Sequence, residues 1–374
     1  MTPRNVHEAV EEVASTSYGR LVAYLASRTG DLAGAEDALA DAFEAALRSW
    51  PTAGVPDRPV TWMLTAAKRS MIGRRRRSDT AARAAPTLAI LADERSETVA
   101  SAVPDKRLEL LFACAHPAID PTIHAPLMLQ TVFGIDVARM SAAFLVEAPA
   151  LGQRLVRAKR KIAAAGIPFE LPGPEDLASR TAVVLDAVYG AYGTGWDDPA
   201  GLDPGRSGLT TEAIRLADLL VELRPSDAEP LGLASLLHHL EARAGARRDD
   251  QGRFVALTAQ DPWRWSPVHL AAGEQLLNRA LALAPPGPYA LLASVGSMHN
   301  RRVIDGRIDW SAVASIYDRL LVLRPTAGVA VARAAAHLEA GNVGVAAEAL
   351  AAIDLVLVDR YQPYWTVVAD VAHR

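Results

Sequence analysis

The sequence predicts an all-α protein with more than one domain. At 374 residues, the chain exceeds one typical domain and can bury two or three cores. Hydrophobic residues make up 50% of it but aromatic residues only 6%. Ala and Leu, which favour helices, fill most apolar positions. Runs of Val, Ile, Thr and aromatic residues, which are typical of strands, are nearly absent.

Composition also limits the classes of function. The single cysteine, Cys114, excludes an intrachain disulfide and a zinc site built from several thiolates. No GxGxxG, Walker A or GxSxG motif is present. We therefore expect no catalytic residue, no metal and no cofactor. No apolar run reaches the roughly 18 residues that span a bilayer, and the N-terminus lacks a signal-peptide core. A cytoplasmic protein that does not contact the membrane is expected.

The net charge of −4 is unevenly distributed. Basic residues outnumber acidic ones up to Glu170, and acidic residues outnumber basic ones after it. This asymmetry suggests that the two parts of the chain have different partners.

Residues 1–78 are expected to form the first helical unit. Apolar periodicity predicts helices over Val6–Arg28, Leu32–Trp50 and Val60–Arg77. Asp31 is suited to cap the second helix, because a carboxylate there accepts free backbone N–H groups. Three prolines and a glycine predict a loop over Pro51–Pro59.

Residues 79–103 are expected to be a linker, since they are rich in Ala, Ser, Thr and charge and show weak periodicity. A second unit should follow over residues 104–170. Its four expected helices are Asp105–Ala115, Thr122–Val132, Val137–Phe144 and Ala150–Ala165. Gly166 and Pro168 should end the last of them.

Residues 171–374 look repetitive. Three amphipathic segments end at Pro225, Pro285 and Pro325, and each precedes another Ala- and Leu-rich helix. Such helical pairs resemble tetratricopeptide-type repeats. An insertion over Gly245–Pro267 carries two tryptophans, which could form a stacking platform but more commonly anchor packing or contact a partner.

The segment Gly134–Ile162 has the pattern of a helix-turn-helix, with its turn over Leu145–Ala148. The second helix has an apolar face made by Leu151, Leu155, Val156 and Ile162. Its other face carries Gln153, Arg154, Arg157, Lys159, Arg160 and Lys161. Early residues of such a helix can reach base edges, while later cations contact phosphates. The alternative is a solvated basic face on an ordinary helix.

A second basic cluster lies in the third helix of the first unit. It consists of Lys68, Arg69, Arg74, Arg75, Arg76 and Arg77. Cations at a helix C-terminus favour the helix dipole, but this accounts for one or two of them. We therefore expect a patch that contacts phosphates.

Taken in their order along the chain, the segments of the first and second helical units resemble the extracytoplasmic-function sigma factors of bacterial RNA polymerase. The resemblance implies that the first unit is sigma domain 2, which binds core polymerase and melts the −10 element. It implies that the second unit is sigma domain 4, which reads the −35 element. Tyr18–Trp50 looks like the first helices of domain 2, in which Glu36, Asp37, Asp41 and Phe43 would contact polymerase. Arg58–Arg77 looks like the −10 recognition helix, with Trp62 in its usual place.

The C-terminal part resembles the subgroup of this family that has a long extension, which is thought to tune activity. The resemblance implies core RNA polymerase and promoter DNA as partners, and a regulatory protein as a further partner at the repeats.

Three positions depart from the family pattern: Arg69 stands where Asn is usual, Gly73 where Asp is usual, and Ala40 where Gln is usual. Two alternatives therefore stay open. One is a sigma-like regulator that cannot melt promoters, and the other is a helical-repeat adaptor that binds only protein.

Two further features favour structural roles. His238 and His239 are adjacent, so they point to different helical faces and make a poor metal pair. Cys114 lies near His116 without any oxyanion-stabilising motif, so a buried structural cysteine is expected.

Overall fold

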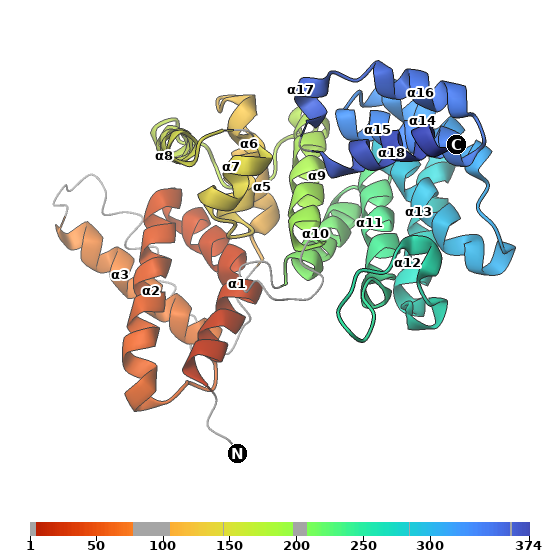
Figure 1. Ribbon diagram of the computed structural model, residues 1–374. Coiled ribbons are helices and arrows are strands. Elements are labelled where there is room, and N and C mark those ends of the chain that lie inside the picture. The colour runs from red at the N-terminus through yellow and green to blue at the C-terminus, as the bar shows by residue number, and fades with distance from the viewer. Residues whose placement is uncertain (1–4, 78–104, 145, 197–207, 284, 360) are drawn as a thin grey trace. The chain divides into compact units, whose positions relative to one another are not determined.

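The structure is a computed structural model that describes residues 5–77, 105–144, 146–196, 208–283, 285–359 and 361–374. Within these ranges the protein is all-α, as the sequence predicts, and has no β-strand (Figure 1). The chain divides into two compact units, Met1–Leu216 and Ala217–Arg374. The predicted linker, residues 79–103, lies outside the described residues.

Unit 1 contains two groups of helices. The first group is α1 (Val6–Thr29), α2 (Leu32–Ala53) and α3 (Pro59–Arg77); the second is α5 (Arg107–Cys114), α6 (Pro121–Thr131), α7 (Val137–Ala143), α8 (Ala148–Ala164) and α9 (Pro174–Trp196). Within the first group, α2 packs against both α1 and α3. The two groups also contact each other, because α1 packs on α5 and α2 packs on α8.

The ends of α2 and α8 show how local sequence sets the helices. The Asp31 side chain accepts a hydrogen bond from the Gly34 N–H at 2.9 Å, which confirms the predicted cap. α8 ends just before Gly166, whose positive φ of 61° suits glycine. The predicted start of the loop at Pro51 is wrong by three residues. α2 continues through Pro51 until the Gly54 N–H closes the final turn on the Trp50 carbonyl.

α9 joins the predicted C-terminal extension to the second helix group. It packs against α6 and α5, and the connecting residues Ile167 and Phe169 are buried. α10 (Leu209–Leu223) begins in unit 1, where Glu212 pairs with Arg107 of α5, and ends in unit 2. The first helix of the extension is therefore part of unit 1.

Unit 2 consists of helices packed on their sequence neighbours. They are α11 (Ala228–Glu241), α12 (Pro267–Leu283), α13 (Pro288–Asp305), α14 (Trp310–Leu323), α15 (Ala327–Glu339), α16 (Val343–Ala351), α17 (Leu355–Val358) and α18 (Gln362–His373). α10, α12 and α14 each end two residues before the proline that the sequence pattern singled out. This agrees with the predicted proline-ended helices.

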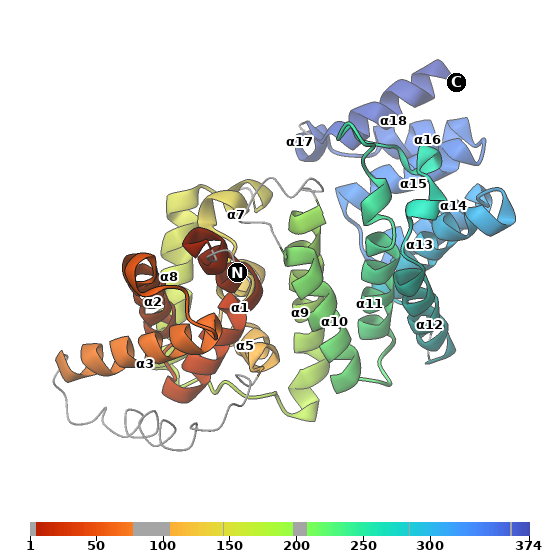
Figure 2. The ribbon, with the colours of Figure 1, turned by 90° about the horizontal axis from the view of Figure 1, so that it is seen from below.

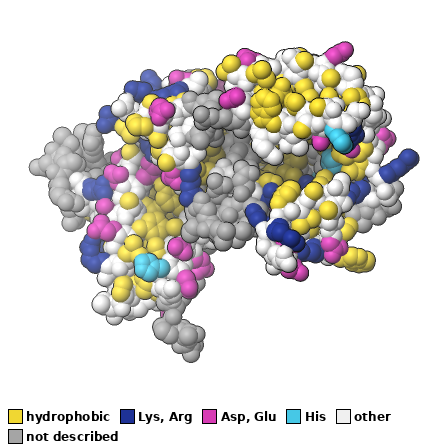
Figure 3. All heavy atoms as spheres, in the orientation of Figure 1, with side chains coloured by type: hydrophobic (Ala, Val, Ile, Leu, Met, Phe, Trp, Pro, Cys, Tyr) yellow, Lys and Arg dark blue, Asp and Glu magenta, His cyan; other side chains and the backbone are white. Residues whose placement is uncertain are grey.

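The two tryptophans of the insertion have different environments. Trp265 is 6% exposed and lies under the Arg302 guanidinium, which is 5.5 Å from the ring centroid, so it anchors packing. Trp263 is 95% exposed. Unit 2 also presents an apolar patch at the end that holds α17, formed by Leu355, Val356 and Leu357 (Figure 3).

Candidate nucleic-acid and polymerase interfaces

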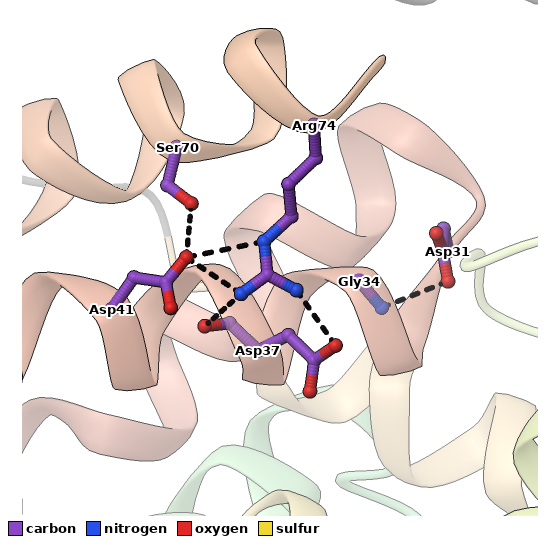
Figure 4. Close-up of polar contacts among 6 residues, drawn as sticks. All are labelled: Asp31, Gly34, Asp37, Asp41, Ser70 and Arg74. Atoms are coloured by element: carbon purple, nitrogen blue, oxygen red, sulfur yellow. Dashed lines mark hydrogen bonds and ion pairs between the residues drawn. The ribbon is translucent and has the colours of Figure 1, made fainter. Parts of the chain in front are cut away.

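The carboxylates of α2 that were expected to bind polymerase are tied to α3. Arg74 donates to the Asp37 carboxylate at 2.8 Å and to the Asp41 carboxylate at 2.6 Å (Figure 4). Ser70, one turn earlier on α3, donates to the same Asp41 oxygen. Hydrogen bonding to Asp41 raises the pKa of the Arg74 guanidinium. Asp37 and Asp41, which were expected to contact polymerase, thus form ion pairs with Arg74, which was expected to contact DNA.

The other residues of α3 that were predicted to contact DNA differ in their exposure to solvent. Lys68 is 4% exposed, with its ammonium 5.3 Å from the centroid of the Tyr24 ring. Trp62 is half-buried, in an edge-to-face contact with Trp50. Arg69 is exposed. The side chains of Arg75, Arg76 and Arg77 lie outside the described residues. Among the described side chains of the α3 cluster, Arg69 is therefore the exposed cation.

α8 keeps most of its predicted basic face in solvent. Leu151, Leu155 and Ile162 are each at most 1% exposed and face the core. The exposed polar side chains opposite them are Gln153, Arg157, Arg160 and Lys161. Figure 3 shows Lys and Arg side chains gathered over this part of unit 1. The placement of Val156 on the apolar face was wrong. It is 48% exposed, because it falls outside the stripe made by the three core residues.

α7 precedes α8 and packs against it, so the two helices predicted for the helix-turn-helix are present and in contact. Met140 of α7 is buried at 2% exposure. The predicted turn is displaced by one residue toward the N-terminus, since α7 ends at Ala143 and α8 begins at Ala148. Leu145 lies outside the described residues.

Beside α8 is a hollow of about 200 Å³ whose cations are Arg154, Arg157 and Lys161. Arg154 donates a hydrogen bond to the Thr122 hydroxyl at the start of α6. A helix N-terminus and nearby cations together attract phosphate. Asp120, which also lines the hollow, caps α6 and opposes an anion there. The cations therefore outnumber the acidic group in the lining.

Lys159 of α8 and Glu36 of α2 are mostly buried, unlike most of the residues with which they were expected to form binding surfaces. The Lys159 ammonium donates to the Glu36 carboxylate at 2.5 Å, and the two side chains are 11% and 15% exposed. Burial raises the pKa of Glu36, while the adjacent Lys159 opposes that rise. Burial, with a further contribution from Glu36, raises the pKa of Tyr18. In this structure Lys159 faces protein. Phe43, the remaining predicted polymerase contact, is half-buried on α2.

Sequence reasoning missed the buried Arg107. Its guanidinium is 3% exposed and bonds both to Asp105, at 2.7 Å, and to Glu212 at the start of α10. No local pattern marks Arg107 as paired, because Glu212 lies far along the chain. This residue links α5 to the extension.

Cys114 is buried, as expected, and the adjacent histidines His238 and His239 have different neighbours. The Cys114 thiol is buried, which raises its pKa to about 12. His238 contacts His269, whereas His239 contacts Asn300, so the two point to different neighbours. In the described part of the chain no group of three His, Cys, Asp or Glu side chains could hold a metal. No described helix is long and apolar enough to cross a membrane.

Comparisons with known proteins match two separate parts of the chain. Residues 14–80, which include α2 and α3, match sigma-70 region 2, and residues 180–281 match a family of unknown function (DUF6596). An uncharacterized protein of Rhizobium meliloti (strain 1021) is 36% identical over 324 residues, which is 85% of this chain and 76% of that protein. No solved structure matches. The chain therefore belongs to the same family as the Rhizobium meliloti protein, and its sigma-70 region 2 supports a sigma-factor-like role in binding RNA polymerase.

Proposed function

We propose that this protein is a sigma factor of the extracytoplasmic-function type that directs core RNA polymerase to particular promoters. In this proposal, α2 contacts polymerase through Asp37, Asp41 and Phe43, and α8 reads the upstream promoter element. The observation that carries the proposal is the exposed basic face of α8 in a chain that also has a sigma-70 region 2.

The geometry of α8 supports duplex DNA as its ligand. Its apolar stripe is buried, so Gln153, Arg157 and Arg160 project together into solvent. Side chains at these positions can enter a major groove while a later cation such as Lys161 contacts the backbone. Arg154 near the start of α6 supplies a further position for a phosphate.

The test is selection of DNA by the purified protein together with core polymerase. A pool of duplexes with a randomised stretch is incubated with core enzyme, with and without the protein, and bound duplexes are sequenced. The proposal predicts that the protein co-elutes with core enzyme and enriches one sequence family. If the protein co-elutes but enriches no sequence, promoter recognition is wrong; if it does not co-elute, the sigma-factor assignment is wrong.

A second candidate is a sigma-like regulator that binds polymerase but does not melt DNA. The buried Lys68 and the ion-paired Arg74 favour it, because α3 then offers fewer cations to a melted strand. Permanganate reactivity of thymines in the selected duplexes separates the two candidates. Reactive thymines that depend on the protein favour the sigma factor, and their absence in a bound complex favours the regulator.

We propose further that the extension supports activity by holding the second helix group in place. Its first helix, α9, packs on α5 and α6, and Glu212 of α10 pairs with the buried Arg107. A tetratricopeptide-like nature of unit 2 and a regulatory protein that binds it stay predictions.

A further inference from the structure

Unit 2 has a hollow of about 620 Å³ that is lined by α12, by α13 and by the segment that leads into α14. Figure 2 shows α12 beside α11 and α13, and it packs against both of them. The lining on α12 includes Glu274, Leu277 and Leu281, and the lining on α13 includes Ser297, Met298 and Arg301. Sites for small molecules typically have volumes of about 300–1,000 Å³. The hollow therefore has the size of a ligand site, and the proposed function makes no use of it.

Buried polar groups adjoin the Glu274 carboxylate in this hollow. The hydroxyl of Ser297, a residue that is 6% exposed, donates to the carboxylate at 2.5 Å. Burial lowers the pKa of the fully buried His239 of α11, so its ring is neutral at neutral pH. The Asn300 amide donates to Nδ1 of this ring at 3.1 Å, so the ring proton is on Nε2. Nε2 lies 3.9 Å from the Glu274 carboxylate and has no hydrogen-bond partner among the described residues.

Two glycines make room for the His239 ring. A Cβ atom on Gly273 of α12 would lie 2.9 Å from a ring carbon, and one on Gly296 of α13 would lie 3.2 Å from the His239 Cβ. Both glycines are inside helices, where glycine is less favourable than alanine. The sequence thus has two unfavourable residues that admit a polar ring, and not an apolar side chain, beside the carboxylate of the hollow.

The remaining lining adds positive charge close to this carboxylate. Arg301 follows Ser297, the partner of Glu274, by one helical turn, or about 6 Å along the axis of α13. Arg307 follows the end of the same helix and also lines the hollow, and both arginines are exposed. Asp309, a further residue of the lining, caps α14. The hollow therefore carries a carboxylate at one level of α13 and guanidinium groups about one turn further along.

We propose that this hollow binds an apolar dipeptide with free termini, which is a zwitterion with an apolar body. Glu274 pairs with the ammonium group, and Arg301 and Arg307 pair with the carboxylate. The peptide side chains contact the apolar lining, where Leu281 is 45% exposed. The termini of an extended dipeptide are about 7 Å apart, which suits partners one helical turn apart. The site lies within unit 2 and does not depend on the proposed function.

The test is isothermal titration calorimetry of the whole chain with leucyl-leucine and with two blocked forms of it. N-acetyl-leucyl-leucine lacks the ammonium group, and leucyl-leucine amide lacks the carboxylate. We expect saturable binding of leucyl-leucine and an affinity about tenfold or more lower for each blocked form, because each loses hydrogen bonds to a charged group. Absence of binding by leucyl-leucine, or equal binding of all three compounds, would overturn the proposal.

Two substitutions assign the termini of the dipeptide to residues of the hollow. Glu274→Gln keeps an acceptor for Ser297 but removes the charge. It should weaken the binding of leucyl-leucine and leave that of the acetylated form unchanged. Arg307→Ala, at an exposed position, should weaken the binding of leucyl-leucine and leave that of the amide unchanged.

Gln275→Ala is the matched control, because Gln275 is exposed on α12 and lies outside the lining. It should bind all three compounds as the unsubstituted protein does. If Glu274→Gln and Arg307→Ala both bind leucyl-leucine with unchanged affinity, this hollow is not the site. Equal weakening of all three compounds by both variants would show that neither residue contacts a terminus, which overturns the proposal as well.

Discussion

α3 and α8 are both helices with clustered cations, yet the structure uses their cations differently. On α3, Lys68 lies over an aromatic ring in the interior and Arg74 pairs with two carboxylates of α2. On α8, Arg157 and Arg160 are exposed. A cluster of positive charge in a sequence therefore does not by itself mark a nucleic-acid surface, because a neighbouring helix can supply the counter-charges.

The largest expected effect comes from removing the extension, because its first helix packs on α5 and α6 of the second helix group. Truncation after Leu171 removes α9 from α5 and α6 and leaves Arg107 without Glu212. We expect a loss of at least about 1.5–3 kcal/mol in unfolding free energy, the value of one hydrogen bond to a charged group. Transcription in a promoter assay should fall as well. Equal or higher transcription by the truncated form would contradict the supporting role.

A single substitution tests the ion pair between Arg107 and Glu212 without removing the extension. Glu212→Gln should lower the midpoint of chemical unfolding, because the buried Arg107 then keeps one carboxylate partner. Glu222→Gln, at an exposed position on the same helix, is the matched control and should have no effect.

The second-largest effect is expected on the binding of core polymerase by the carboxylates of α2. Reversing both charges in Asp37→Lys with Asp41→Lys should weaken co-elution with core enzyme about tenfold or more, since like charges at an interface cost several kcal/mol. Glu44→Lys, on the same helix but outside the predicted set, is the control. Retained binding by the double variant, at equal stability, would argue against this surface.

The third effect tests whether the exposed cations of α8 contact DNA, in contrast to the paired cations of α3. Arg157→Ala and Arg160→Ala should each weaken duplex binding and reduce the slope of log affinity against log salt by about 0.9, the value for one phosphate contact. Arg279→Ala, at an exposed position in unit 2, should change neither quantity. Unchanged affinity and slope in both α8 variants would remove the recognition-helix assignment.

Arg74→Ala should have a smaller effect, and on stability. Its side chain is 37% exposed and its partners are 65% and 44% exposed, so solvent weakens both ion pairs. We expect a loss of about 0.2–1 kcal/mol in unfolding free energy and an unchanged salt slope. Arg69→Ala on the same helix should instead lower the slope, because Arg69 is exposed. A slope reduced equally by both variants would show that Arg74 leaves its carboxylates to contact DNA.

The smallest effect is expected at Gly73. A Cβ atom there would meet nothing within 4 Å. Gly73→Ala should therefore raise the unfolding free energy by about 0.5–1 kcal/mol, because Ala loses less backbone entropy in a helix. Thermal unfolding measures this change. Destabilisation would mean that α3 requires glycine for a backbone geometry that Ala cannot adopt.

The sequence predicted the helices well because their signals are local. The Asp31 cap and the Gly166 end depend on residues within one turn, and both are confirmed. The apolar repeat at Leu151, Leu155 and Ile162 also fixed which face of α8 is buried.

The partners of individual charges could not be predicted. Arg74 meets Asp37 only because α2 and α3 pack together, and Lys159 meets Glu36 only because α8 packs on α2. The pairing of Arg107 with Glu212 has the same origin. Periodicity identifies the buried face of a helix, but it does not identify the element that covers the remaining faces.

The sigma-factor assignment itself is tested most directly by run-off transcription with purified core polymerase on a fully duplex template carrying the selected sequence. The account predicts a transcript of defined length that requires the protein and is reduced by Arg157→Ala with Arg160→Ala. A template melted in advance shows whether the core enzyme is active. Absence of a transcript from the duplex, while the melted template is transcribed with this protein present, would contradict the assignment.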